Sequence, residues 1–462
     1  MTRQIRTGAA AATLLASLLA PSAAQAAVPV GVAQAAVPGG VAQAAVQGGS
    51  AAVQGGAEPG APGPYRVASQ DYTLGDRVFQ VPGFHVNPED EALADLEVTG
   101  NVHYPTSAAG GPYPLVVLSH GYWATCADRE AAEIKAAREA ALSEEEIYDD
   151  PAWLAAIGRL WRWPCVPGVT PLPSYQGYDY LAERLASHGM VVVSVSANGV
   201  NAGELGEAAD AARAGVINKH LALWSELTRT GRGPLAGKLR GAFKGLIDLT
   251  RVGTLGHSRG GRGVAWHAAD VHANALPAGV RIKGVIALAA AGAGTSTQPG
   301  SPEAPLYRVT AAPLAVWLGS CDTDQGEDYL TLAQGHTRFP NYRWTVGGAN
   351  HNFLNTQWSP GSGQVEAVDD GAGPEPGLCG DQVWDIPDGW DPEDPSSPQP
   401  TKHWENVVHK LTEDEEHRVL TGYATAFFLE TLRGDRRYAD VLDGVRQPYR
   451  SFTGITADKI KP

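Results

Sequence analysis

Runs of apolar residues recur along the middle of the chain, separated by amphipathic stretches. Nearly continuous apolar runs are typical of strands that are buried on both faces of a sheet. The strands predicted in this way cover residues 114–119, 190–196, 281–289, 313–319 and 342–346. Helical periodicity over residues 178–188 and 208–227 predicts helices between them. This alternation predicts an α/β fold with a mostly parallel, doubly wound central sheet and helices on both faces.

Further elements flank this alternating core. The sequence also predicts two opening antiparallel strands, at residues 65–72 and 94–104, and a further helix at residues 235–249. The sequence Thr412-Glu-Asp-Glu is a capping box, which predicts the start of a last helix over residues 413–433.

Two insertions interrupt the core pattern. The first, residues 127–170, contains a helical stretch at 129–142 and a Trp-rich stretch at 153–163. The second, residues 359–400, is rich in Asp, Glu, Pro and Gly. Clustered carboxylates suit calcium, but a solvated acidic loop is the favoured interpretation of this segment.

The amino terminus resembles an export signal. Two arginines precede the apolar residues 9–20, and an Ala-Gln-Ala cleavage site follows, so we predict a secretory signal peptide at 1–26. Residues 27–63 are a short, almost uncharged repeat of Ala, Val, Gln and Gly, which predicts a disordered spacer. The folded domain would then cover residues 64–462.

The net charge of the chain disfavours some classes of binding partner. The chain has 462 residues, a formal net charge of −15 and a pI of about 5.3. This charge disfavours nucleic acid and anionic membrane surfaces as partners. No later apolar stretch is long enough for a transmembrane helix. We therefore expect an exported monomer without a membrane span.

A nucleophile motif lies at the centre of the chain. Residues 256–260, Gly-His-Ser258-Arg-Gly, follow a predicted strand and precede a helical stretch. In this G-x-S-x-G pattern a tight strand-to-helix turn exposes the serine hydroxyl, and the glycines avoid clashes. The alternative is a structural glycine turn that happens to contain serine.

An acid and a base follow later strands in a fixed order. Asp322 comes just after the strand at 313–319, and His351 follows the strand at 342–346. The order Ser, Asp, His is that of the α/β-hydrolases. A histidine can take the serine proton, and a carboxylate can orient the imidazole. Asp324 is the alternative acid, and a loop cap is the alternative role for Asp322.

The turn after the first buried strand, His120-Gly121-Tyr122, predicts an oxyanion hole. The backbone N–H groups of Tyr122 and Arg259 are its expected donors. An ordinary strand-to-helix loop is the other interpretation. Trp123 and Trp358 flank these motifs, and they are candidates for an apolar substrate pocket or for packing of the insertions.

Four cysteines, Cys126, Cys165, Cys321 and Cys379, allow three pairings. We favour Cys126–Cys165 and Cys321–Cys379, because each bridge would close one insertion beside a catalytic loop. No C-x-x-C or H-x-x-x-H spacing occurs, so neither a metal nor another cofactor is expected.

Four segments carry a family resemblance: residues 118–126, 256–261, 319–324 and 347–358. On these the chain resembles secreted bacterial α/β-hydrolases, in the branch that includes chlorophyllases, dienelactone-hydrolase-like enzymes and polyester hydrolases of the PET and cutinase type. The resemblance spans residues 65–444 and implies an α/β-hydrolase fold with a serine triad. The two insertions depart from the compact polyester hydrolases.

These motifs predict a serine hydrolase that cleaves carboxylic esters, small or polymeric, through an acyl-enzyme. A serine peptidase or amidase would use the same triad, although no propeller-like repeat is present. A non-catalytic binding protein on this scaffold is the third interpretation.

Overall fold

The computed structural model describes residues 58–292, 300–322, 326–367, 372–391, 394, 396–449, 451–452 and 454–462. These residues belong to one compact unit, Glu58–Pro462. The predicted signal peptide, and the predicted spacer up to residue 57, lie outside the described residues.

The compact unit begins at Glu58, earlier than the predicted domain start at residue 64. Two hydrogen bonds attach this first segment to the rest of the fold. The Gly63 N–H donates to Ser187 Oγ at 2.9 Å, and the Ala61 carbonyl lies 2.9 Å from His188 Nε2. The last residues of the predicted spacer are therefore packed against the domain.

A nine-stranded sheet forms the centre of the fold, in the order β1-β2-β4-β3-β5-β6-β7-β8-β11. Strands β3 to β8 run parallel to one another, whereas β1, β2 and β11 pair antiparallel with their neighbours at the edges. The prediction of a mixed α/β fold with a mostly parallel sheet is confirmed. The strands are β1 Val67–Phe79, β2 Leu96–Pro105, β3 Tyr113–Ser119, β4 Val191–Val195, β5 Ile247–His257, β6 Ile282–Leu288, β7 Leu314–Gly319, β8 Asn341–Val346 and β11 Ile455–Ile460.

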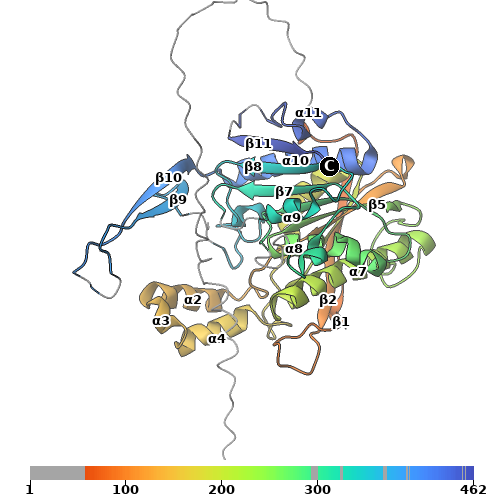
Figure 1. The fold of residues 1–462 in the computed structure, drawn as a ribbon. Helices are drawn as coiled ribbons and strands as arrows, with labels where there is room; N and C mark the ends of the chain where they lie inside the picture. Colours follow the sequence, from red (N-terminus) through yellow and green to blue (C-terminus); the bar gives the residue numbers. More distant parts are fainter. Residues whose placement is uncertain are drawn as a thin grey trace, which may run out of the picture. The chain divides into compact units, whose positions relative to one another are not determined.

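Helices cover both faces of this sheet. Helices α7, Glu207–Thr230, and α8, Arg259–Ala268, pack on one face and lie in front of the sheet in Figure 1. Helices α5, Asp179–Ser187, and α10, Glu413–Arg433, pack on the other face.

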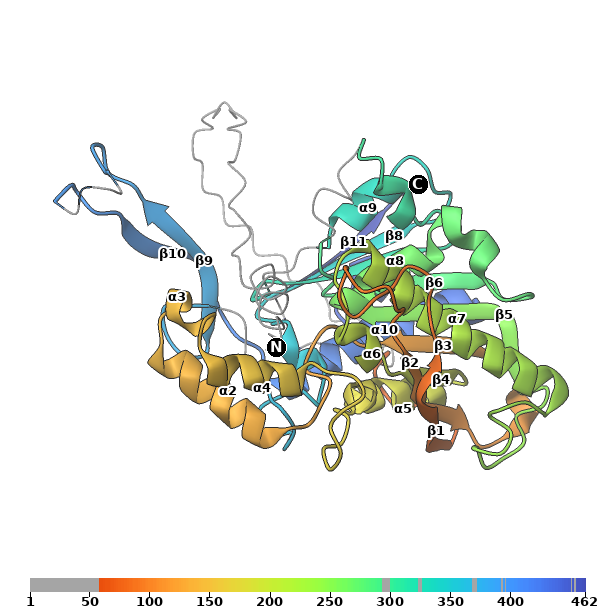
Figure 2. The same cartoon turned by 90° about the horizontal axis from the view of Figure 1, so that it is seen from below.

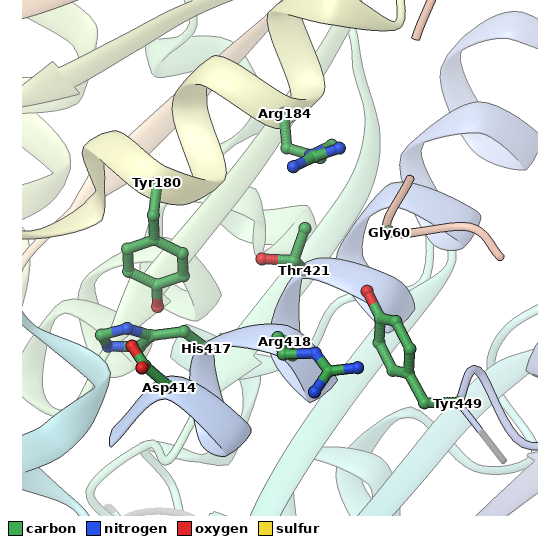
Figure 3. A pocket seen from close by; sticks show the side chains of 8 residues that line it. All are labelled: Gly60, Tyr180, Arg184, Asp414, His417, Arg418, Thr421 and Tyr449. Atoms are coloured by element: carbon green, nitrogen blue, oxygen red, sulfur yellow. The ribbon is translucent and has the colours of Figure 1, made fainter. Parts of the chain in front are cut away.

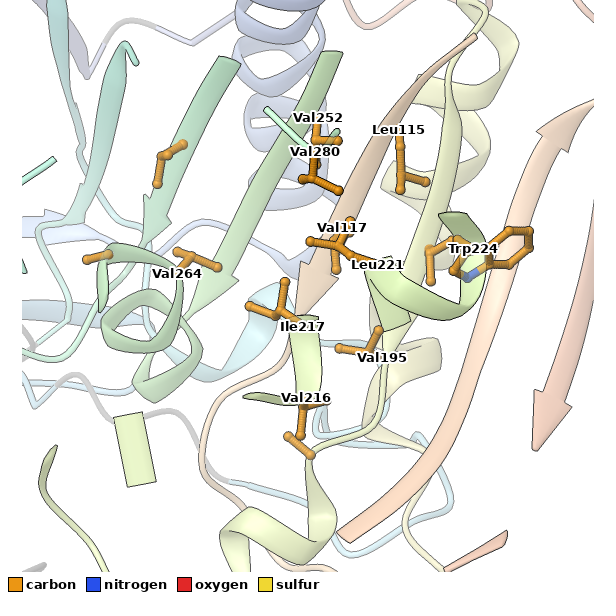
Figure 4. Packing of buried hydrophobic residues seen from close by; sticks show 14 of the residues in the cluster. Leu115, Val117, Val195, Val216, Ile217, Leu221, Trp224, Val252, Val264 and Val280 are labelled. Carbon is orange, nitrogen blue, oxygen red and sulfur yellow. The ribbon is translucent and has the colours of Figure 1, made fainter. Parts of the chain in front are cut away.

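Strand β3 contributes side chains to both layers. Its Leu115 and Val117 join the cluster that Figure 4 shows with Ile217 and Leu221 of α7. The intervening residues of β3 belong to the opposite cluster, with α5 and α10. Burial on both faces explains why β3 is almost continuously apolar in the sequence.

The two insertions extend away from the sheet (Figures 1 and 2). The first contains α2, Arg129–Ala141, α3, Glu144–Ile147, and α4, Pro151–Leu160. The second includes a strand of a separate hairpin, in which β9, Leu378–Asp385, pairs with β10, Thr401–His409. The hairpin is a new finding, because both of its strands are polar and largely exposed and do not alternate in the sequence.

Both disulfides join the cysteines that were paired by the sequence argument. Cys126–Cys165 spans 39 residues in the first insertion, and Cys321–Cys379 spans 58 residues and ends in β9 of the hairpin. Bonds of this kind are typical of proteins that fold in oxidising compartments.

One predicted element is wrong. Residues 235–249 do not form a helix: they form turns up to Leu246, and then β5 begins at Ile247. Gly241 and Gly245 have φ values of +113° and +73°, which an α-helix cannot accommodate. The remaining short elements are α6 Asn198–Asn201, α9 Asp328–Ala333, α11 Ala439–Leu442, and the 3-10 turns Ala108–Gly110, Ser174–Tyr178, Asp270–Ala275, Ala304–Tyr307 and Asn352–Leu354. Across the described ranges, no helix has the length and apolar character needed to cross a bilayer.

Candidate active site

The topology brings the candidate residues together at the carboxyl ends of the parallel strands. The chain passes from β3 to β4 on one side and then to β5 on the other side of β3. A ligand crevice is expected at such a switch point, beyond the carboxyl ends of the strands. Ser258 follows β5, Tyr122 follows β3, and Asp322 and His351 follow β7 and β8.

Ser258 occupies the tight turn between β5 and α8. Its φ is +57°, a left-handed conformation that is rare for a residue with a side chain. Its N–H donates to the Leu288 carbonyl at 3.0 Å, which fixes the turn to β6. A β-carbon on Gly256 would collide with the Gly260 carbonyl, so this close approach requires glycine. The G-x-S-x-G spacing is therefore a consequence of the turn geometry.

The side chains of Asp322 and His351 lie within hydrogen-bond distance of each other. His351 Nδ1 lies 3.1 Å from both carboxylate oxygens of Asp322. The Asp322 side chain is fully buried and the His351 side chain is 11% exposed. Because a carboxylate only accepts, Nδ1 carries the hydrogen and Nε2 is left as the basic nitrogen. The alternative acid, Asp324, lies outside the described residues.

The loop that carries His351 is held from several sides. The Asn350 N–H donates to Glu416 of α10 at 3.2 Å, and Asn350 Oδ1 accepts two backbone N–H groups at 3.0 Å. The Cys321 N–H donates to the Ala349 carbonyl at 2.9 Å, which joins the acid loop to the histidine loop. The imidazole therefore has a defined position before any substrate binds.

His257, directly before Ser258, adds a second imidazole to the site. Its ring lies 4.8 Å from that of His351, and its Nδ1 is 2.8 Å from the Tyr178 hydroxyl. Burial, and then the neighbouring His351, lower the pKa of His257 far below its usual value. It is therefore a neutral packing and hydrogen-bonding group beside the base. No separate feature of the sequence marks this histidine, because it occupies a variable position of the motif.

The turn after β3 lies directly against the serine. A β-carbon on Gly121 would stand 2.5 Å from Ser258 Cβ, so only glycine allows the two to approach in this way. The Gly121 carbonyl accepts from Asn201 Nδ2 at 3.1 Å and bonds with His120 Nδ1 at 2.9 Å. In a trans peptide the N–H points opposite to the carbonyl. The Tyr122 N–H is thus directed away from these two donors.

Both predicted oxyanion donors have free N–H groups. Within the described ranges, the Tyr122 N–H donates to no acceptor. Arg259 is the first residue of α8, so its N–H has no acceptor within the helix. The helix start also carries a partial positive charge that suits an anion.

A buried cation stands behind this turn. Arg213 of α7 is fully buried; it donates to the His120 carbonyl at 3.1 Å and to Asn201 Oδ1. Asn201 Nδ2 in turn donates to the carbonyls of Gly121 and Trp123, at 3.1 and 3.2 Å. Burial lowers the pKa of Arg213 to about 10, so it stays charged at neutral pH. Sequence reasoning missed this network, since a polar residue on a helix usually faces water.

His120 is held in one tautomer. Its Nε2 accepts the Ala197 N–H at 2.8 Å, so its Nδ1 carries the hydrogen that reaches the Gly121 carbonyl. Burial, and then the charge of Arg213, lower the pKa of His120 to about 3. The ring is therefore a neutral donor that orients the same peptide as Asn201.

Several aromatic side chains pack against one another beside the turn after β3. Tyr122 stacks on Trp161 of the first insertion, with ring centroids 6.4 Å apart, and Trp123 meets Trp161 at 5.9 Å. Trp358 is fully buried and its Nε1 donates to Ser174 Oγ at 2.9 Å. Of the two predicted pocket residues, Trp123 is therefore half-buried in this aromatic cluster, whereas Trp358 is fully buried. Trp161 was not predicted.

The described ranges contain no group of three or more His, Cys, Asp or Glu side chains arranged to hold a metal ion. Part of the acidic insertion lies outside those ranges. No protein-family model matches the chain, and no curated protein matches it either.

Proposed function

We propose that this protein is a serine hydrolase of the α/β-hydrolase fold that cleaves carboxylic esters through an acyl-enzyme. The observation that carries the proposal is one arrangement at one sheet edge. Ser258 sits in a left-handed turn before a helix, and the Asp322–His351 pair follows two nearby parallel strands. A nucleophile, a base and an orienting acid are the three parts that such catalysis requires.

In the first step, Ser258 Oγ attacks the ester carbonyl while His351 Nε2 takes the hydroxyl proton. The carbonyl electron pair moves to oxygen, which becomes an oxyanion near the N–H groups of Tyr122 and Arg259. Asp322 accepts the Nδ1 hydrogen bond and stabilises the imidazolium without taking the proton.

In the second step, the oxyanion collapses and the alcohol leaves with the proton from His351, which gives the acyl-enzyme. Water then attacks the acyl group, and His351 takes a proton from it and returns one to Ser258. The products are a carboxylate and an alcohol, and no cofactor takes part.

The half-buried Tyr122, Trp123 and Trp161 favour an apolar or aromatic substituent on the ester, because aromatic walls bind such groups well. The disulfides support export to an oxidising compartment, as the signal-like amino terminus predicts. We propose that the protein acts there as a monomer on small or polymeric esters.

The test is a chain-length series of p-nitrophenyl esters, assayed beside peptide amides of matched acyl groups. We expect turnover of esters, much weaker cleavage of amides, and loss of both in Ser258→Ala. Faster cleavage of amides would favour the peptidase alternative. Equal turnover by the wild type and by folded Ser258→Ala would contradict the role of Ser258, and no turnover of esters or amides by the folded wild type would favour a binding protein.

A further inference from the structure

A hollow of about 370 Å³ opens between α5 and α10 and is lined by residues of both helices (Figure 3). Its residues take no part in the chemistry proposed for Ser258. Tyr180 and His417 stack as one wall, with ring centroids 3.9 Å apart. Their polar atoms are engaged: the Tyr180 hydroxyl donates to Leu354 O at 3.0 Å, and His417 Nε2 lies 2.6 Å from Phe353 O.

Two guanidinium groups reach into this hollow. Arg184 comes from α5 and Arg418 from α10, with Thr421 between them (Figure 3). Neither arginine has a carboxylate partner within 4.0 Å in the part of the chain that the structure describes. This is notable in a chain with a net charge of −15, in which carboxylates outnumber cations.

The surroundings of the two arginines differ. Arg184 Nη1 is buried and has no hydrogen-bond partner. A buried donor of this kind is costly unless an acceptor reaches it. Arg418 lies over the Tyr449 ring, 4.9 Å from its centroid, which orients the guanidinium at the edge of the hollow.

The neighbouring Tyr449 and His417 side chains are uncharged at neutral pH. Burial, followed by the charge of Glu58, raises the pKa of Tyr449, so its hydroxyl stays protonated. Burial lowers the pKa of His417 to about 4, so that ring carries no charge at neutral pH. Asp414 is the only acidic residue that lines the hollow in the described part of the chain, and it is exposed.

We propose that this hollow is a binding site for a small oxyanion, a phosphate or carboxylate group held between Arg184 and Arg418. Guanidinium groups bind the paired oxygens of such anions through two parallel hydrogen bonds. Thr421 and Tyr449 also line the hollow and offer hydroxyls nearby. The site is independent of Ser258, so it does not require the proposed ester hydrolysis.

The test is isothermal titration of the full chain at low ionic strength with inorganic phosphate and, separately, with benzoate. Benzamide, which lacks the charge, is the matched control ligand. We expect one of the two anions to bind with a dissociation constant of about 1 mM or tighter, and benzamide not to bind. Stronger binding of phosphate or of benzoate identifies which oxyanion the site prefers. Added salt should weaken the binding.

Variants locate the site. Arg184→Gln and Arg418→Gln should each weaken binding about tenfold, as expected for one charge-assisted contact. Arg77→Gln, which changes an exposed arginine that faces Asp95 elsewhere, should leave binding unchanged. Asp414→Asn should tighten it, because a repulsive charge is removed. Circular dichroism and ester turnover check that each variant is folded. No binding of either anion to the wild type, or binding as tight as that of the wild type by the folded Arg184→Gln and Arg418→Gln proteins, would overturn the inference.

Discussion

Asn201 offers a specific test of how the proposed oxyanion hole is held. Its Nδ2 donates to the Gly121 and Trp123 carbonyls, and its Oδ1 accepts from the buried Arg213. The Gly121 carbonyl belongs to the same peptide as the Tyr122 N–H. Asn201 therefore acts as a positioning residue that orients the N–H through the other end of its peptide.

The size of the effect follows from these contacts. Losing one oxyanion donor outright costs about 10²–10³ in kcat. Asn201→Ala removes one of the two groups that hold the Gly121 carbonyl, while His120 remains. We therefore expect kcat to fall about 10- to 100-fold, which is about 1.4–2.7 kcal/mol, with little change in KM. Stability should also fall, by about 1–3 kcal/mol, because buried hydrogen bonds are lost.

Asn201→Asp separates the two roles of this residue. Its carboxylate can still accept from Arg213, but it cannot donate to the Gly121 and Trp123 carbonyls, and it brings a negative charge near the oxyanion. The expected order of kcat is wild type, then Asn201→Ala, then Asn201→Asp, at a temperature where all three are folded.

The assay pairs ester kinetics with a tetrahedral analogue, a trifluoromethyl ketone. Its inhibition constant should rise in proportion to the loss of kcat/KM, since both report on the same oxyanion contact. A folded Asn201→Ala protein with kcat within about twofold of wild type, or an unchanged inhibition constant beside a lower kcat, would refute the reasoning.

Further predictions concern the acid, the crosslinks and pH. Asp322→Asn should lower kcat by about 10⁴, whereas Asp324→Asn should cost far less; the reverse result in ester assays would exchange their roles. The two disulfides close loops of 39 and 58 residues, worth about 4 kcal/mol each in the chain-entropy estimate. Mild reduction should therefore lower the activity at temperatures below that at which the core unfolds. Unchanged activity in a protein whose disulfides are reduced, as verified by counting its thiols, would argue against this. Burial lowers the pKa of His220 to about 3, below the value of about 6.5 in the unfolded chain. Its contribution to stability is thus full above pH 6.5 and is lost as pH falls, by about 2 kcal/mol at pH 5. His220→Asn, which keeps a partner for Tyr72, should reduce this slope in denaturant titrations, and an unchanged slope would show that other groups dominate it.

The sequence predicted the sheet well where burial on both faces produced an unmistakable pattern. Strands β3, β4 and β7 are buried throughout and almost continuously apolar. The topology alone places the residues that follow such parallel strands at the carboxyl ends of the sheet. The Cys pairing could be reasoned in the same way, because each bridge closes an insertion.

Other features left no such pattern. Residues 235–249 show helical spacing of apolar positions, but glycines at positive φ turn the chain there. The β9–β10 hairpin exposes most of both strands, so no face was marked as buried. Arg213 reads as an ordinary polar position on α7, and only the packing of α7 against the turn after β3 makes it a buried partner of that turn.

Labelling of the nucleophile tests the central claim most directly. The full chain is treated with a fluorophosphonate probe, and intact mass and peptide mapping locate the adduct. The proposal predicts one adduct per chain, on Ser258, that is absent from folded Ser258→Ala and is prevented by prior incubation with the trifluoromethyl ketone. An adduct on another residue, or no adduct in a folded protein that still hydrolyses esters, would contradict it.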